Sequence, residues 1–172
     1  MIERARSGSV QLTSKRHAEM RTRFKCLVVR YMEKTMADMK YINHENLNIV
    51  ELIPVGDVQI KDILRYGNEL LDKGLMKQDT IEYVDMSNMT NLSVDYNSSH
   101  QLITLHEEWL NCGWYGSVYY TPELFQLGII NMVGAVIKSQ PDVKLPDGIM
   151  YPSREKIPIS SVRDFLSCHL NT

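Results

Sequence analysis

Apolar residues recur at helical spacing over residues 14–39. This spacing predicts one long helix, because side chains three and four positions apart share one face of a helix. Thr13 or Ser14 can cap its start. A helix of this length is rarely stable alone in water, so we expect its apolar stripe to pack on the rest of the chain or on a second copy. The stripe consists of Met20, Phe24, Leu27, Val28, Tyr31 and Met39, and the first five are the candidate self-association residues.

A buried strand and a well-signalled helix follow. Residues 47–57 are mostly apolar and predict a short buried strand that ends at Pro54 and Gly56. Asp57 can cap a helix over 58–73, and Gly74 stands where a residue of left-handed conformation commonly ends a helix. This segment is therefore predicted as one strand followed by one helix.

The middle of the chain alternates between β-prone and polar segments. Residues 80–86 are rich in β-branched and aromatic side chains and predict a strand. Residues 87–100 contain repeated Asn and Ser, and predict a loop with a short strand at 92–96.

The aromatic stretch 101–127 holds both tryptophans and three of the nine tyrosines. Apolar side chains alternate on both sides of Cys112–Gly113, which predicts a hairpin with a two-residue turn. A three-residue loop would put the two apolar sets on opposite faces, so the shorter loop is favoured. The alternating residues are Ile103, Leu105, Trp109, Trp114, Val118 and Tyr120.

The last third predicts mixed structure. Thr121 and the following Pro and Glu can start a helix, while 129–137 is compatible with either helix or strand because glycine weakens the helical pattern. Residues 139–158 carry four prolines and predict an extended connector. A capping box at Ser161 predicts a short terminal helix.

Together these elements predict an α+β fold, with a small, mostly antiparallel sheet and packed helices over residues 41–138. Residues 1–40 are predicted as a basic arm with a long helix, and residues 139–172 as a proline-rich connector with a short helix. At 172 residues the chain is one domain in this interpretation.

Charge is unevenly distributed. Residues 1–40 hold 10 Lys and Arg against 4 Asp and Glu, although the net charge of the whole chain is −2. A basic arm on an acidic body indicates an anionic partner, such as RNA, a nucleoprotein or an anionic membrane surface; the alternative is that the arm docks on its own acidic body. The candidate anion-binding residues are Lys15, Arg16, Arg21, Arg23, Lys25 and Arg30.

The cysteines and the first residues indicate an intracellular protein. Cys26, Cys112 and Cys168 are odd in number and widely spaced, which is typical of free thiols in a reducing compartment. The first 20 residues lack the apolar core of a secretory signal, so we expect a protein that is not secreted.

Catalytic and metal-binding patterns are weak. His106 and Cys112 invite a thiol-hydrolase hypothesis, but on an extended strand they would lie about 20 Å apart. The His and Cys spacings do not match a zinc site, and no glycine-rich phosphate loop is present. We therefore expect no enzyme activity, no catalytic residues, no metal, no cofactor and no small-molecule substrate.

Two blocks resemble the matrix proteins of rhabdoviruses, particularly the short ones of plant rhabdoviruses. The run GWYGSVYYTPELFQL at 113–127 resembles the end of the matrix domain, and IKDILRYGNELLDKG at 60–74 resembles the family's first core helix. The chain departs from the family in its pI of about 6.2 and in lacking the proline-tyrosine budding motif. The resemblance implies a structural protein that self-associates and bridges nucleocapsid and membrane, located in the host cytoplasm or in the virion. The alternatives are a phage or viral regulator that binds nucleic acid through the arm, and a small thiol hydrolase.

Overall fold

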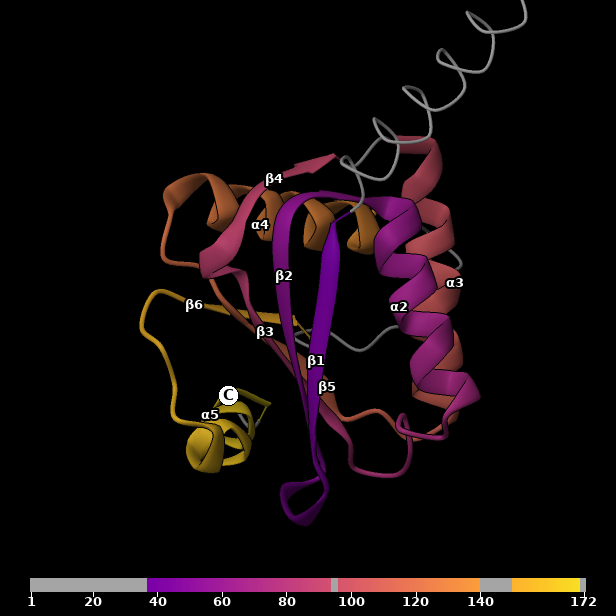
Figure 1. Ribbon diagram of the computed structural model, residues 1–172, viewed down its shortest axis with the longest axis vertical. Coiled ribbons are helices and arrows are strands. Elements are labelled where there is room, and N and C mark those ends of the chain that lie inside the picture. Colours follow the sequence, from indigo (N-terminus) through magenta and orange to yellow (C-terminus); the bar gives the residue numbers. More distant parts are fainter. Residues whose placement is uncertain (1–36, 94–95, 140–149, 171–172) are drawn as a thin grey trace, which may run out of the picture. The chain divides into compact units, whose positions relative to one another are not determined.

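The computed structural model describes residues 37–93, 96–139 and 150–170. These residues form six strands and four α-helices, joined by short 3-10 turns (Figure 1). In chain order the elements are β1 (Asp38–His44), β2 (Ile49–Gln59), α2 (Ile60–Asp72), β3 (Ile81–Asp85), β4 (Met89–Ser93), α3 (Tyr96–Asn111), β5 (Gly116–Tyr120), α4 (Leu124–Lys138), β6 (Met150–Ser153) and α5 (Val162–Leu170).

The sheet is mixed and mostly parallel, with the order β1-β2-β3-β5-β6 and β4 beside the far half of β2. The β1–β2 pair is antiparallel, while β2–β3, β3–β5 and β5–β6 are parallel. The fold is therefore α/β, and the expectation of a mostly antiparallel sheet is wrong. The reason is that α2 lies between β2 and β3, α3 between β4 and β5, and α4 between β5 and β6. Helical crossovers of this kind, unlike tight turns, make neighbouring strands parallel.

The predicted aromatic hairpin is the largest local error, because residues 101–111 belong to helix α3. The buried positions Leu102, Leu105, His106 and Trp109 recur at the spacing of one helical face. If His106 is counted as a polar residue, the helical spacing is lost and only the alternating pattern of a strand remains. Gly113 does make a turn, with φ of 95°, but this turn joins α3 to β5.

Other local predictions differ in their outcome. The strand at 80–86 and the helix at 58–73 are confirmed as β3 and α2, and Gly74 is left-handed with φ of 62°. The predicted cap is wrong, because Asp57 still belongs to β2 and α2 begins at Ile60 with Gln59 as its N-cap. Residues 129–137, which were open between helix and strand, are helical. Met39 lies in β1 and not in a helix, and the predicted connector contains β6.

Strand β2 continues past Pro54, where the sequence predicted its end. Its partner β3 pairs with residues 49–52, and β4 pairs only from Gly56 onward. Pro54 therefore lies between the two parallel partners, where its missing N–H interrupts neither ladder. The register shifts directly after Gly56, whose φ is 85°.

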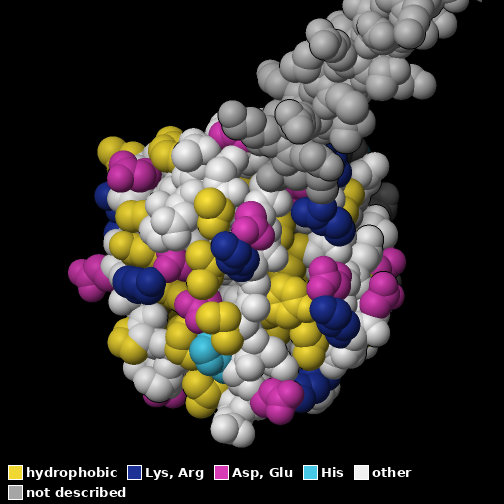
Figure 2. All heavy atoms as spheres, in the orientation of Figure 1, with side chains coloured by type: hydrophobic (Ala, Val, Ile, Leu, Met, Phe, Trp, Pro, Cys, Tyr) yellow, Lys and Arg dark blue, Asp and Glu magenta, His cyan; other side chains and the backbone are white. Residues whose placement is uncertain are grey.

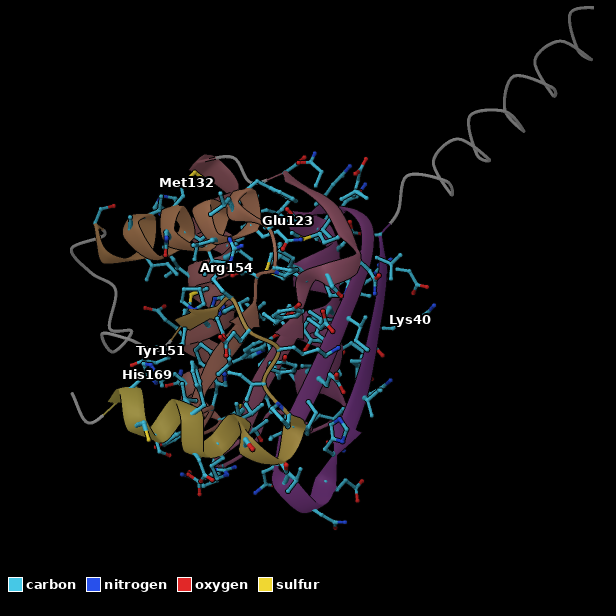
Figure 3. The ribbon with its side chains drawn as sticks, turned by 90° about the vertical axis from the view of Figure 1, so that its left-hand side faces the viewer. Lys40, Glu123, Met132, Tyr151, Arg154 and His169 are labelled. Atoms are coloured by element: carbon cyan, nitrogen blue, oxygen red, sulfur yellow. The ribbon has the colours of Figure 1, made fainter. Side chains whose placement is uncertain are left out.

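The helices cover the two faces of the sheet unequally. Helices α2, α3 and α4 pack on one face, where Val50, Leu52 and Val84 meet Leu70 and Trp109. Helix α5 packs on the other face through its buried residues, which are Val162 and Leu166. Figures 1 and 3 show α5 apart from the other three helices. Helices α2 to α4 therefore enclose the larger core.

Helices α2 and α3 approach closely at Gly67. The Leu105 side chain occupies the space that a Cβ atom of residue 67 would need. The Trp109 indole Nε1 donates a hydrogen bond of 3.3 Å to the Gly67 carbonyl oxygen. This contact fixes the position of two α3 side chains, Leu105 and Trp109, that border an internal cavity.

None of the described helices has the length and apolar character needed to cross a lipid bilayer. Helix α4 nevertheless exposes large apolar side chains on its outer side. Leu124 is 74 % exposed, and Phe125 and Met132 are about half exposed. Figure 3 shows Met132 on this helix.

Candidate functional site: an apolar cavity with one buried carboxyl

A cavity of about 70 Å³ lies between the sheet and helices α2, α3 and α4. It is smaller than the apolar cavity of ~150 Å³ that can hold benzene in an engineered protein. Four methionines form part of its wall. Because methionine is unbranched and adapts its shape, such a wall can repack around a guest. The four are Met39, Met86, Met89 and Met150.

Glu82 brings a carboxyl group into this apolar wall. It is the second residue of β3 and is 3 % exposed. The Ser117 hydroxyl, on the neighbouring strand β5, donates a hydrogen bond of 2.5 Å to Glu82 Oε2. Strand pairing places these two side chains opposite each other, since Glu82 and Ser117 are register partners.

Burial raises the pKa of Glu82 to about 7, because the charged carboxylate loses its hydration. The hydroxyls of Ser117, Tyr66 and Tyr119 favour the ionised form and limit this rise in pKa. The carboxyl therefore exchanges its proton near neutral pH, unlike an exposed glutamate.

Two buried tyrosines, Tyr66 and Tyr119, lie close enough to Glu82 for its charge to raise their pKa. Burial, and then the Glu82 charge, raise the pKa of both Tyr66 and Tyr119 well above its usual range, so both remain protonated. The Tyr66 hydroxyl nevertheless makes no hydrogen bond of good geometry within the described part of the chain. A buried hydroxyl without a hydrogen-bond partner destabilises the folded state. The polar groups around Glu82 are therefore incompletely satisfied.

His106 supplies a further titratable group of the wall. Its Nδ1 atom lies 2.7 Å from the Leu102 carbonyl oxygen, which can only accept, so Nδ1 carries the proton. Burial lowers the pKa of this imidazole. The ring packs against Trp109 and Trp114, with centroid distances of 5.4 and 5.1 Å. His106 is therefore a neutral, aromatic part of the wall at neutral pH.

Glu82 is the one formally charged side chain among the described residues that line the cavity at neutral pH. The remaining wall is aliphatic, thioether or aromatic, with Trp109 and Tyr119 as the large aromatic groups. Such a site offers shape, apolar contact and a single carboxyl group to a guest molecule.

The residues predicted from sequence do not form this site. The basic and apolar residues of the arm lie outside the described residues, so their roles stay predictions. His106 and Cys112 share helix α3 and the turn that follows it, but His106 is buried and Cys112 is exposed, so the two side chains are not brought together. Within the described residues, no group of three His, Cys, Asp or Glu is placed to hold a metal ion.

Glu82 was the functional candidate that sequence reasoning missed. It stands inside the β-prone run IEYVD, whose five residues are all buried. A carboxyl in a strand that is buried on both faces is unusual, since charged residues are rarely fully buried without a partner. A glutamate within an otherwise apolar, β-prone run was therefore the signal in the sequence. It indicates a functional site only if 81–85 is recognised as an interior strand.

The surface over β1 and β2 differs from the cavity in character. Figure 2 shows apolar, basic and acidic side chains interspersed across this face. Opposite charges also meet in pairs there, as between Lys40 and Asp38 on β1. This face therefore shows no concentrated basic area, within the described residues, of the kind that binds nucleic acid.

Comparisons with known proteins establish no family for this α/β chain. No family model matches it, and no curated protein matches its sequence. One solved structure to which it is similar is an uncharacterized protein of the DUF3478 family, with a SpoIIAA-like fold, from Shewanella loihica PV-4. The TM-score is 0.47 and the identity 12 %, over 78 % of this chain and 94 % of that one.

The resemblance to rhabdovirus matrix proteins is wrong, and with it the prediction of a viral structural protein. The block at 60–74 does form a helix, but 113–127 supplies an interior parallel strand followed by the start of α4. The inferred order of elements failed because α3 had been interpreted as a strand.

Proposed function

We propose that the described domain is a non-enzymatic binding module that takes a small, mostly apolar molecule into the cavity between the sheet and helices α2 to α4. The observation that carries this proposal is the cavity itself, with its four methionines and a single carboxyl group. A concave apolar site with few polar groups is typical of small-molecule binding.

The size of the cavity limits the guest. A volume of about 70 Å³ admits only a few heavy atoms without movement of the wall. Met86 and Met89 flank the turn after β3, and Met150 starts the edge strand β6. Changes in the side-chain rotamers of these methionines would enlarge the space without breaking the sheet.

Binding is favoured over catalysis by the placement of the polar groups. Ser117 is the hydroxyl hydrogen-bonded to a carboxyl, which is the arrangement of an activated nucleophile. It is completely buried and does not line the cavity, so a guest cannot reach it. His106 Nδ1 donates its proton to the Leu102 carbonyl oxygen, and the ring packs between Trp109 and Trp114 as part of the wall. We therefore propose a binding role for Glu82 without a chemical step.

Benzene is expected to stabilise the protein. At ten times its Kd a ligand that binds only the folded state adds about 1.4 kcal/mol, which corresponds to a rise in Tm of about 3–6 °C for a chain of this size. Val133→Phe should remove this rise, because Val133 is 7 % exposed and lines the cavity. Differential scanning calorimetry with and without benzene measures the effect.

The matched control is Met132→Phe. Met132 neighbours Val133 on α4 but is 48 % exposed and lies outside the lining. This variant should keep the full benzene effect. Equal Tm values with and without benzene in the wild type, or equal stabilisation of both variants, would show that the cavity is not the binding site.

A further inference from the structure

We propose that the natural ligand of the cavity is a small apolar amine, bound as its ammonium ion against the Glu82 carboxylate. This inference rests on the proposed binding function and names the chemical class of the ligand. Its support comes from the charge of the cavity wall, the unused hydrogen-bond acceptor capacity of the carboxylate, and the aromatic side chains around it.

The charge of the cavity wall determines which sign of charge a ligand can carry. Glu82 is the one formally charged lining residue at neutral pH, and neither Lys nor Arg lines the cavity in the described chain. A carboxylate or phosphate guest would place a second negative charge in a site of low dielectric, where like charges repel strongly. An ammonium group instead neutralises the Glu82 charge that burial has made unfavourable.

The polar neighbours of Glu82 leave room for a further donor. Ser117 donates to Oε2, and the Tyr66 and Tyr119 hydroxyls lie close enough to favour the ionised carboxyl. An ionised carboxylate has about four acceptor sites on its two oxygens. An ammonium group, with up to three N–H donors and no acceptor, fits this unused capacity, whereas a pure hydrocarbon leaves it unused.

The aromatic wall adds to the same preference. Trp109 and Tyr119 line the cavity together with Glu82, and His106 contributes a neutral ring. The faces of Trp and Tyr attract cations, and this attraction grows when the cation is desolvated. A carboxylate combined with aromatic faces therefore suits an organic cation better than a neutral alcohol of the same shape.

Ligand binding should depend on pH through Glu82. The groups that act on this carboxyl are Tyr66 from α2 and Ser117 and Tyr119 from β5, and His106 from α3 lines the same cavity. Both tyrosines stay protonated, and His106 is largely neutral near pH 7 because burial lowers its pKa. Glu82 is thus the group that changes charge near pH 7, and its ionisation favours an ammonium guest.

Isothermal titration calorimetry with three probes tests this inference. Cyclopentylamine is the cationic probe, cyclopentanol is the neutral probe of similar size, and benzene reports the cavity alone. Cyclopentylamine should bind the wild type about tenfold more tightly at pH 8 than at pH 6, because the ionised fraction of a carboxyl with a pKa near 7 rises by about that factor. Binding of cyclopentanol and benzene should be the same at both pH values.

Glu82→Gln provides the matched variant, since glutamine keeps the shape and can still accept from Ser117. It should bind benzene like the wild type, which shows that the cavity is intact, and lose both the preference for cyclopentylamine and its pH dependence. If the wild type binds benzene but binds cyclopentylamine no better than cyclopentanol at pH 8, the amine inference is wrong and the binding function stands. If the wild type binds none of the three probes, the binding function itself is wrong.

Discussion

Replacing Trp109 by alanine is expected to lower the free energy of unfolding by about 3–5 kcal/mol, the usual cost of deleting a buried tryptophan. Trp109 is 1 % exposed and joins α3 to its neighbours. Its ring packs edge-on to Tyr66, at 6.2 Å, and to Trp114, at 5.6 Å, and its Nε1 donates to the Gly67 carbonyl. Deleting the ring leaves a large void beside an existing cavity, so the helices cannot collapse to fill it.

Urea unfolding at neutral pH measures this loss. Trp109→Phe is the first control, because it keeps an aromatic ring and loses the indole hydrogen bond, and it should cost clearly less than the alanine variant. Met132→Ala is the second control, since an exposed side chain on α4 should change stability by no more than about 0.5 kcal/mol. A Trp109→Ala variant whose stability lies within about 1 kcal/mol of the wild type would contradict the packing of α2 against α3.

Glu82→Gln is expected to make the protein more stable than the wild type by an amount that grows with pH. The pKa of Glu82 is raised on folding from its ordinary 4.5 to about 7. The folded state therefore binds more protons than the unfolded state between these values, and the stability contributed by the protonated carboxyl falls as pH rises through that window. Between pH 4.5 and pH 8 the difference between variant and wild type should grow by about 3 kcal/mol.

Comparing the two proteins at each pH isolates Glu82 from the other groups. The pKa of His106 is lowered on folding, so its contribution has the opposite sign and is lost as pH falls below its ordinary value of 6.5. The lowered pKa of Asp85, held by Lys156, acts at lower pH still. Both contributions are common to variant and wild type. A difference in stability that stays constant from pH 4.5 to pH 8 would mean that Glu82 is ionised normally in the folded protein.

Local signals were sufficient for the elements whose hydrophobic pattern has a single interpretation. Helix α2 has a polar face, charge pairs and a glycine at its end, and all of these agree. Strand β3 is a short β-branched and aromatic run of the length of a buried strand. In both cases the local preference and the tertiary environment point to the same structure.

Whether the strands pair in parallel or antiparallel could not be predicted from local patterns in the same way. Leu102, Leu105, His106 and Trp109 fit a helical face, but the neighbouring alternation of Ile103 and Leu105 also fits a strand. Choosing the strand replaced one crossover helix by a hairpin, and that single change converts parallel pairing into antiparallel pairing. The tertiary packing of α3 against Gly67 of α2 favours the helix over the strand. This packing is not visible in any local sequence pattern.

The candidate site was hidden for a related reason. A glutamate in a strand is charged and exposed by default, and its burial depends on α2 and α3 covering that part of β3. The cavity is assembled from residues as distant in the chain as Met39 and Met150. Such a site is a property of the packed layers, so it follows from the fold and not from any spacing of residues.

The most direct test of the binding function is a titration of the protein, labelled with ¹³C at its methionine methyl groups, with benzene, followed by NMR. The methyl signals of Met39, Met86, Met89 and Met150 should shift in a saturable way, because these side chains line the cavity. Met76 is buried outside the lining and Met132 is exposed, so their signals should not move. If the four lining signals stay in place, or if all six shift to the same extent, the cavity does not bind apolar guests and the proposed binding function is wrong.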